Sequence, residues 1–478
     1  MIRPDPSSQP VARSLHRSLP MTVVRDLVSP ERRDFLWNLS RFGAALLCVA
    51  LGASAFAIVF RAAINFVFRQ LYRAHDVLAA FQALPWYACL AIPAVGGGLA
   101  GFVNSFASRL KGAGSVGDVM EAVVLGNVRF SLRLTSLKAM GSWLAIVSGG
   151  SVGREGSIIQ FGGGLGDAMG RLFRLREGQV RGLIAAGSAA GFAAAYNTPL
   201  AAVLFVVEVV TGIIALDIVL PAIVATPIAT ALTRLVAGSG PIYGHRTFAV
   251  GSDFVLFAPA LLGLLAGLTG PAFMALLKIG ETWFHKLSVP AALRAGIGGL
   301  TVGALAIKLP QVTGNGYEAI DLILAGQIGL GLILVLLFGK ALATTASVSS
   351  GSPGGVFTPS LFLGAALGGA FGHFRAHVDA AAAVDAVQGY SLIGMAAMIA
   401  ATTHAPVMAA AMVFELSGDY AIVLPLLVAT GTATLLSKRL RPDSVYGEEL
   451  RRKGMAWDIT IEGRRIRPRG NESKLPPS

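Results

Sequence analysis

The chain has 478 residues, of which 54% are hydrophobic and 14% are charged. Soluble domains carry about 25% charged residues, so this composition argues against a soluble protein. It also argues against a disordered or collagen-like chain, because apolar residues are plentiful and no Gly-X-Y period is present. The 58 glycines are an excess, and glycine is frequent in membrane helices that pack closely. The composition therefore predicts a large polytopic membrane protein.

The net charge of +13 fits either a nucleic-acid binder or a membrane protein with positively charged cytoplasmic flanks. Lysine and arginine gather at both ends of the chain, for example at Arg32, Arg33, Lys438 and Arg439. This pattern favours the membrane class and argues against a nucleic-acid partner. We expect a multi-pass protein of the cell (inner) membrane, embedded in the lipid bilayer, with both termini cytoplasmic and an even number of crossings.

Taken in chain order, a basic cytoplasmic tail (residues 1–40) is followed by a first membrane repeat (41–240), a second (250–450) and a basic cytoplasmic tail (451–478). Apolar runs long enough to span a bilayer predict continuous helices at residues 42–68, 86–106, 254–277 and 322–338. Other apolar segments are interrupted by glycine, proline or polar residues, which predicts half-helices that meet inside the membrane. These segments are residues 139–152, 184–210, 342–367 and 395–414.

An internal repeat supports this division. Residues 187–208 align with residues 394–415 at an offset of 207, with glutamate at the end of both segments. Residues 153–157 align with residues 355–359 at an offset of 202. Two related halves with breaks at matching places are typical of a transporter whose site lies at the repeat interface. The residues themselves leave open whether the two halves are parallel or inverted.

Three glycine-rich stretches, at residues 111–118, 153–157 and 354–360, each precede an apolar helix. A helix N-terminus carries a partial positive charge and unpaired N–H donors, and glycine lets an ion approach them. Several such ends meeting inside the membrane would form an anion site without a full positive charge. Partial charges also bind weakly enough to release the ion.

These stretches resemble the CLC family of chloride channels and proton-coupled chloride transporters. The family pattern GSGIP resembles residues 112–116, GREGP resembles residues 153–157, and GGIFAP is similar to residues 354–359. A family tyrosine matches Tyr446, and Lys138 has the position of a family lysine. The order and spacing agree from about residue 42 to residue 450.

The resemblance implies an all-α membrane fold, an inverted repeat of about 18 tilted and broken helices per subunit. It also implies a homodimer with a pore in each subunit, bound chloride ions and no cofactor. Glu155 would be the gate, whose carboxylate competes with chloride and leaves when protonated. The anion-binding positions that the resemblance implies are Gly112, Ala113 (backbone only), Gly114, Gly153, Gly156, Gly354, Gly355, Val356, Phe357 and the Tyr446 hydroxyl.

The residue types support these roles and leave alternatives. An acid in a break of an apolar segment is functional by default, so Glu155 is interpreted as a gate rather than a structural ion-pair partner. Arg154 and Lys138 are assigned electrostatic roles; Arg154 either guides anions or pairs structurally. Phe357 could be plain core packing, and Tyr446 could belong to an interfacial aromatic belt.

Departures from the family pattern bear on mechanism. Ala113 stands where the family has a serine that contacts the central anion, so the preference for chloride is in question. Val116 and Ser157 replace prolines at helix starts, with small expected consequences.

Val209 stands where coupled members often have a proton-transfer glutamate, and the neighbouring Glu208 points about 100° away on a helix. We therefore predict uncoupled or channel-like conduction. The alternative is proton-coupled antiport, because some coupled members lack this acid too.

Other classes of protein have little support. The chain has no HExxH and no P-loop, so we predict no enzyme activity. His373 and His377 share a helical face without a nearby acid, and Cys48 and Cys89 lie in apolar runs, so no metal site is predicted. A non-transporting membrane scaffold would not explain the paired glycine-rich breaks, and a fluoride-selective transporter is a rival of the same class. The short segment after Tyr446 leaves no room for paired CBS domains.

Overall fold

The computed structural model describes residues 30–110, 112, 114–126, 128–238, 240, 242–244, 256–378, 383–460 and 463–468. Most of these residues are helical. In chain order the elements are α2 (Pro30–Gln70), α3 (Val77–Ala83), α4 (Trp86–Ala107), α5 (Val116–Leu125), α6 (Leu132–Val147), α7 (Glu155–Leu172), α8 (Glu177–Tyr196), α9 (Pro199–Phe205), the π-helix η1 (Val206–Thr211), α10 (Leu216–Ala237), α11 (Phe257–Lys286), α12 (Ala291–Ala306), the 3-10 helix η3 (Pro310–Val312), α13 (Tyr317–Leu324), α14 (Leu330–Ser349), α15 (Phe357–Val378), α16 (Ala383–Thr403), α17 (Pro406–Ser417), α18 (Val423–Leu440), α19 (Val445–Arg452), β1 (Met455–Thr460) and β2 (Gly463–Pro468).

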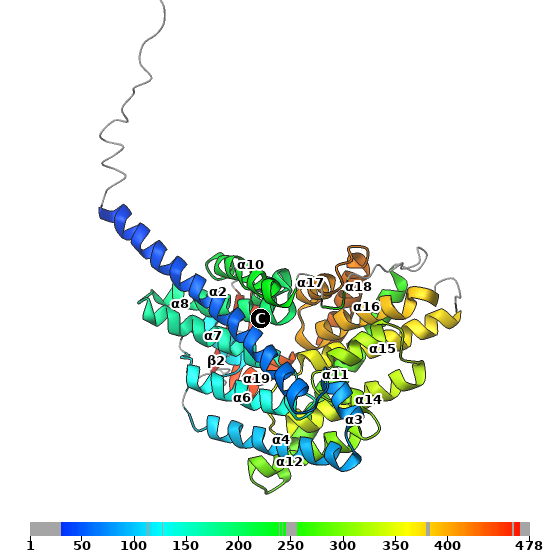
Figure 1. Ribbon diagram of the computed structural model, residues 1–478. Coiled ribbons are helices and arrows are strands. Elements are labelled where there is room, and N and C mark those ends of the chain that lie inside the picture. Colours follow the sequence, from blue (N-terminus) through cyan, green and yellow to red (C-terminus); the bar gives the residue numbers. More distant parts are fainter. Residues whose placement is uncertain are drawn as a thin grey trace, which may run out of the picture.

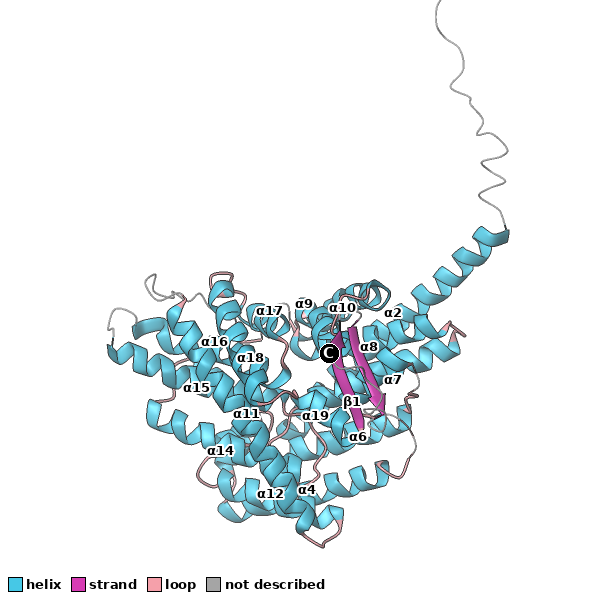
Figure 2. Ribbon diagram, turned by 180° about the vertical axis from the view of Figure 1, so that it is seen from behind, coloured by secondary structure: helices cyan, strands magenta, loops and turns pink. Residues whose placement is uncertain are grey.

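Part of each predicted repeat lies on its own side of the molecule, whereas α4 of the first repeat packs against α12 of the second. Helices α7, α8 and α10 gather on one side, and α15, α16 and α18 gather on the other (Figure 1). Helix α2 crosses the first group, and its N-terminal end extends beyond the rest of the molecule (Figures 1 and 2). This arrangement places the ends of α7 and α15 toward the middle, between the two groups.

Six of the described helices are long and apolar enough to cross a membrane: α2, α4, α10, α11, α14 and α16. Three of the predicted spans lie largely within α2, α4 and α11. The prediction of one continuous span at residues 322–338 is wrong, because α13 ends at Leu324 and α14 begins at Leu330. Gly326 between them has a positive φ of 67°, which ends the first helix.

The predicted breaks inside apolar segments are confirmed. Helix α6 stops before α7, α8 before α9, α14 before α15, and α16 before α17. Two of the breaks have the same backbone. Asn197 and His404 are left-handed, with φ of 58° and 59°, and the next residues, Thr198 and Ala405, have φ of −124° and −123° with ψ of 77° in both. Residues related by the offset of 207 therefore have nearly the same backbone dihedral angles at the helix break.

Glycines let the paired helices of each half approach closely. A Cβ atom on Gly162 of α7 would lie closer than 3.0 Å to the carbonyl oxygen of Gly187 in α8, and one on Gly364 of α15 would collide in the same way with the carbonyl oxygen of Gly394 in α16. Gly364 follows Gly162 at the offset of 202, and Gly394 follows Gly187 at the offset of 207. The same close packing thus recurs in both halves.

The two halves also exchange a glutamate each. Glu208 accepts hydrogen bonds of 3.2 and 2.7 Å from the N–H groups of residues 407–408, at the start of α17. Glu415 accepts bonds of 2.9 and 2.8 Å from the N–H groups of residues 200–201, at the start of α9. A carboxylate at a helix N-terminus satisfies unpaired donors and complements the helix dipole. This reciprocal exchange is the signature of a two-fold relation between the halves, in agreement with the predicted inverted repeat of broken helices.

Both ranges predicted as tails contain regular structure. Helix α2 begins at Pro30, inside the range 1–40, and β1 and β2 form an antiparallel hairpin inside the range 451–478. The other parts of these ranges, residues 1–29, 461–462 and 469–478, lie outside the described residues. Strand β2 packs against α5 and η1, and β1 packs against α19; Figure 2 draws the two strands in magenta. The predicted fold therefore needs one addition, a two-stranded hairpin after the last helix.

The glutamate exchange leads to a stability prediction. We expect Glu415→Ala to lower the free energy of unfolding by about 1–2 kcal/mol, because two N–H donors of α9 lose their acceptor. Glu415→Gln keeps one acceptor oxygen without the charge and should fall between wild type and Glu415→Ala. Thermal unfolding in detergent measures the order. Asp34→Ala, which removes an exposed acid on α2, is the control, and an unchanged melting temperature for Glu415→Ala contradicts the prediction.

Candidate functional site

A pair of backbone hydrogen bonds joins the two glycine-rich motifs of the two halves. The Gly153 N–H donates to the Gly355 carbonyl oxygen at 2.7 Å, and the Gly355 N–H donates to the Gly153 carbonyl oxygen at 2.8 Å. This antiparallel bridge lies just before α7 and α15, which begin at Glu155 and Phe357. It therefore holds two helix starts from different halves side by side.

A cavity of about 450 Å³ lies against these helix starts. Its lining includes Glu155, Gly156, Val356, Phe357 and, from another part of the chain, Tyr446. The first N–H groups of a helix have no partner within that helix, and the dipoles of both helices place partial positive charge at this end. The structure thus brings together the predicted anion-binding positions on α7 and α15, including Gly354 and Gly355.

Glu155 is almost completely buried, with 1% of its surface exposed. Its Oε1 accepts a hydrogen bond from the Thr358 hydroxyl, and its Oε2 has no hydrogen-bond partner among the described residues. A Cβ atom on Gly153 would collide with that Oε2, so the glycine makes room for the carboxylate. Leaving one oxygen of a buried carboxylate without a partner is unfavourable, and this favours a side chain that can leave its place.

Two arginines converge on the Ala195 carbonyl oxygen, and one of them, Arg154, precedes Glu155 in the chain. Arg154 donates from Nη2 to the Ala195 carbonyl oxygen at 3.4 Å, and its guanidinium lies 4.9 Å from the centre of the Tyr317 ring. Arg61 donates to the same carbonyl oxygen, also at 3.4 Å. Among the described residues neither arginine forms an ion pair with an acid. The alternative that Arg154 guides anions stays a prediction.

Tyr446 and Lys138 line other parts of the cavity. Tyr446 is on α19, half-buried, with its ring 6.2 Å from that of Phe205. Its hydroxyl makes no hydrogen bond to the part of the chain that the structure describes, so an ion in the cavity could contact it. Lys138, on α6, donates to the Gly114 carbonyl oxygen at 2.6 Å.

The stretch at residues 111–118 is used differently from the other two motifs. Gly114 lines the cavity, but its N–H donates to Asp118 Oδ2 at 2.7 Å, and the Gly117 N–H donates to Glu449 Oε2 at 3.2 Å. Burial alone would raise the pKa of Asp118; Lys453 and the Gly114 bond outweigh it, and the pKa is lowered. An ionised carboxylate thus already occupies this N-terminus. Gly112 is exposed with φ of 135°, and Ala113 lies outside the described residues.

Val209 lies in η1 with 2% of its surface exposed, away from the cavity lining. Its neighbour Glu208 is engaged with the start of α17. Whether Glu208 replaces an acid at position 209 in transport stays a prediction. No group of three or more metal-ligating side chains occurs among the described residues.

Sequence reasoning missed three residues near Glu155 and Arg154. Thr358 donates a hydrogen bond to Glu155, and Arg61 lies near Arg154. The Tyr196 hydroxyl oxygen lies 3.1 Å from Oγ1 of Thr358. Thr358 departs from the alanine of the GGIFAP pattern, which was a usable signal. Tyr196 and Arg61 carried none, because only the folded chain brings α2 and the end of α8 to the start of α7.

Comparison with known proteins agrees with this geometry. Residues 95–438 match the family model described as "Voltage gated chloride channel". The chain is 37% identical over 381 residues to a ClcB-like protein of Ralstonia nicotianae, covering 79% of this chain and 88% of that protein. It is 36% identical over 333 residues to the voltage-gated ClC-type chloride channel ClcB of Salmonella dublin, covering 69% of this chain and 78% of the channel.

Solved structures show the same fold. A slow cyanobacterial Cl⁻/H⁺ antiporter superposes with a TM-score of 0.78 at 24% identity, covering 86% of this chain and 98% of the antiporter. A CLC-type fluoride/proton antiporter superposes with a TM-score of 0.70 at 23% identity, with the same coverages. With the paired helix starts, the buried glutamate and the two-fold halves, these matches show that the chain is a membrane protein of the voltage gated chloride channel family, the CLC family.

Proposed function

We propose that this protein transports chloride across the membrane through a pathway at the starts of α7 and α15, and that Glu155 gates it. The observation that carries the proposal is the bridged pair of helix starts beside a buried carboxylate, all lining one cavity. The names of the relatives in Ralstonia and Salmonella, which refer to ClcB and chloride channels, support chloride as the ion.

The proposed binding uses partial charges. Backbone N–H groups at Gly156, Val356 and Phe357 would hold the ion, and the Tyr446 hydroxyl would donate a further bond. Arg61 and Arg154 add an attractive field without lying in the cavity lining. Donors of this kind bind an anion strongly enough to replace its water and weakly enough to let it leave. Lys138 adds a further positive charge at the cavity wall.

The proposed gate uses charge exclusion. An ionised Glu155 carries the same charge as chloride and lies among the same donors, so both cannot occupy the site together. Protonation removes the charge, weakens the attraction of the helix starts for the carboxyl group, and lets chloride take its place. The unpartnered Oε2 of Glu155 means that little bonding is lost when the side chain moves.

We further propose that conduction is uncoupled or channel-like. Val209 offers no acid for a proton route, and Glu208 is engaged with α17. The solved neighbours are described as proton antiporters of chloride and of fluoride, so proton-coupled chloride antiport is the second candidate. The two differ in whether chloride flux drives proton movement.

The proposed assembly is a homodimer in the inner membrane with both termini cytoplasmic. Apolar side chains are exposed on α9 and α17, where Leu200 and Val407 lie beside the exchanged glutamates. This continuous apolar face supports either lipid contact or a second subunit. The mass of the protein in detergent, measured by light scattering, distinguishes one subunit from two.

The gate is tested by Glu155→Gln. Wild-type chloride efflux from liposomes should rise up to about tenfold per unit decrease in pH above the midpoint, since protonation of one carboxyl group follows that slope. The uncharged amide of the variant cannot titrate, so Glu155→Gln should give high efflux with no pH response. Glu177→Gln, which changes an exposed acid on α8, should keep the wild-type response. A normal pH response in Glu155→Gln would show that another group is the gate.

Coupling is tested by recording chloride efflux and proton uptake together in liposomes. We expect chloride movement with little proton movement, and a reversal potential that does not change when a pH gradient is applied. Glu208→Gln should leave the proton-to-chloride ratio unchanged, because Glu208 holds α17. A reversal potential that shifts steeply with the pH gradient favours antiport. Parallel fluoride and chloride efflux measurements decide between chloride and fluoride selectivity.

A further inference from the structure

Three buried side chains from three helices form a continuous chain of hydroxyl and carboxyl groups. Thr358, the second residue of α15, donates to Oε1 of Glu155, the first residue of α7. The hydroxyl oxygen of Tyr196, the last residue of α8, lies 3.1 Å from Oγ1 of Thr358. The exposed fractions of Glu155, Thr358 and Tyr196 are 1%, 0% and 0%, so water does not compete for these bonds.

When Glu155 is ionised, the hydrogen bonds that link Tyr196, Thr358 and Glu155 run in one direction. An ionised carboxylate can only accept, so the single proton of the Thr358 hydroxyl points to Glu155. The Tyr196 hydroxyl can then donate its own proton to Thr358 Oγ1. Successive hydrogen bonds aligned in this way strengthen one another in a medium of low polarity. The bond that ends on the charged carboxylate is the strongest of them.

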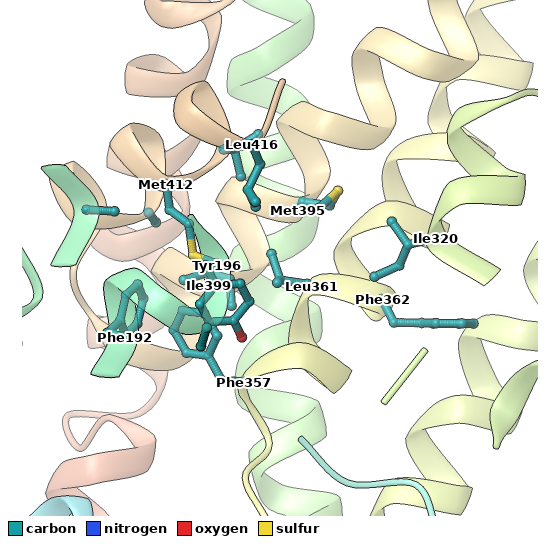
Figure 3. Close-up of a cluster of buried hydrophobic side chains, with 14 of the residues drawn as sticks. Phe192, Tyr196, Ile320, Phe357, Leu361, Phe362, Met395, Ile399, Met412 and Leu416 are labelled. Carbon is teal, nitrogen blue, oxygen red and sulfur yellow. The ribbon is translucent and has the colours of Figure 1, made fainter. Parts of the chain in front are cut away.

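Packing fixes the tyrosine at the far end of the chain. The Tyr196 ring lies 5.2 Å from that of Phe192 and 5.6 Å from that of Phe357. Figure 3 shows the three rings grouped together at one end of the apolar cluster. Helix α8 ends directly after Tyr196, where Asn197 turns left-handed. The hydroxyl is therefore held in place by its ring and by the break that follows it.

We propose that Tyr196 and Thr358 form a hydroxyl latch that retains the ionised Glu155 carboxylate at the helix starts and sets the pH at which the carboxyl group leaves. This inference rests on the proposed gate role of Glu155. Protonation of Glu155 replaces a charge-assisted bond with a weaker neutral one, and the chain of donors can reverse its direction. The latch thus stabilises the closed position selectively when the gate is charged. Tyr196 acts through Thr358 and is a positioning residue.

A purely structural role would use the Thr358 hydroxyl only to satisfy a buried oxygen of Glu155. In that case its removal would destabilise the protein without changing the pH response of transport. The other carboxylate oxygen, Oε2, already lacks a partner in this site. The site therefore does not satisfy both oxygens of the carboxylate. A bond to one oxygen alone suits a side chain that must move.

The test is the pH profile of chloride efflux from liposomes, recorded between about pH 4 and pH 8. Thr358→Val has the shape of threonine without the hydroxyl, and we expect it to move the midpoint to higher pH by about 1–2 units. Protonation then no longer has to weaken a charge-assisted bond. Thr358→Ser restores the hydroxyl and should return the midpoint to that of wild type. Tyr196→Phe should move the midpoint in the same direction by a smaller amount.

Combined variants separate the latch from other effects. Tyr196→Phe combined with Thr358→Val should move the midpoint by less than the sum of the two single shifts, because the bond from the tyrosine passes through the threonine. Thr358→Val in the Glu155→Gln background should leave efflux independent of pH. An unchanged midpoint in Thr358→Val, or fully additive shifts in the double variant, overturns the latch.

Failure of the gate itself is distinguishable from failure of the latch. If wild-type efflux does not depend on pH, or if Glu155→Gln keeps the wild-type pH response, the gate assignment fails before the latch variants are compared. If Thr358→Val does not fold, the latch is tested by comparing Tyr196→Phe with Thr358→Ser. Tyr196→Phe should move the midpoint of the pH profile, and Thr358→Ser should not.

Discussion

The reciprocal backbone bridge between Gly153 and Gly355 is the constraint on which the site depends. Inside a membrane every backbone N–H and C=O group must find a partner within the protein. Two chain segments that interrupt their helices would leave such groups unpaired, and the bridge pairs four of them at once. Because it lies just before α7 and α15, it also fixes the separation of the two helix starts. The proposed anion site therefore uses the same helix starts that the pairing of the breaks holds together.

Close helix packing in each half holds this bridge in place. Gly162 and Gly187 let α7 lie against α8, and Gly364 and Gly394 let α15 lie against α16 at equivalent positions. A side chain larger than hydrogen at Gly162 or Gly364 would meet a carbonyl oxygen of the neighbouring helix. The glycine excess of the composition thus has two physical uses. Some glycines permit helix contact, and a few at the breaks leave room for the carboxylate and the bridge.

The helix breaks and the internal repeat could be predicted from the sequence. Contacts between segments far apart in the chain could not. Proline at residues 199, 353 and 406 interrupts the helical runs for local reasons, so those breaks were predictable. The span at 322–338 was mispredicted because a single positive-φ glycine, Gly326, interrupts an otherwise apolar run. The Ser115-x-x-Asp118 spacing is that of a capping box, so an acid at the start of α5 was predictable. The second carboxylate there, Glu449, comes from a helix far along the chain and no spacing rule could have shown it.

The three glycine-rich motifs, alike in sequence, therefore differ in what faces their helix starts. At α5 the negative charge is Asp118, paired with Lys453 and not free to leave. At α7 and α15 it is Glu155, held by a single hydroxyl, with one oxygen unpartnered and with Arg61 and Arg154 nearby. The same partial charges that stabilise a fixed carboxylate in the first case stabilise an exchangeable one in the second. The two carboxylates thus differ in the number of bonds that hold them rather than in the helix dipole, and this difference is what the proposed gate role of Glu155 depends on.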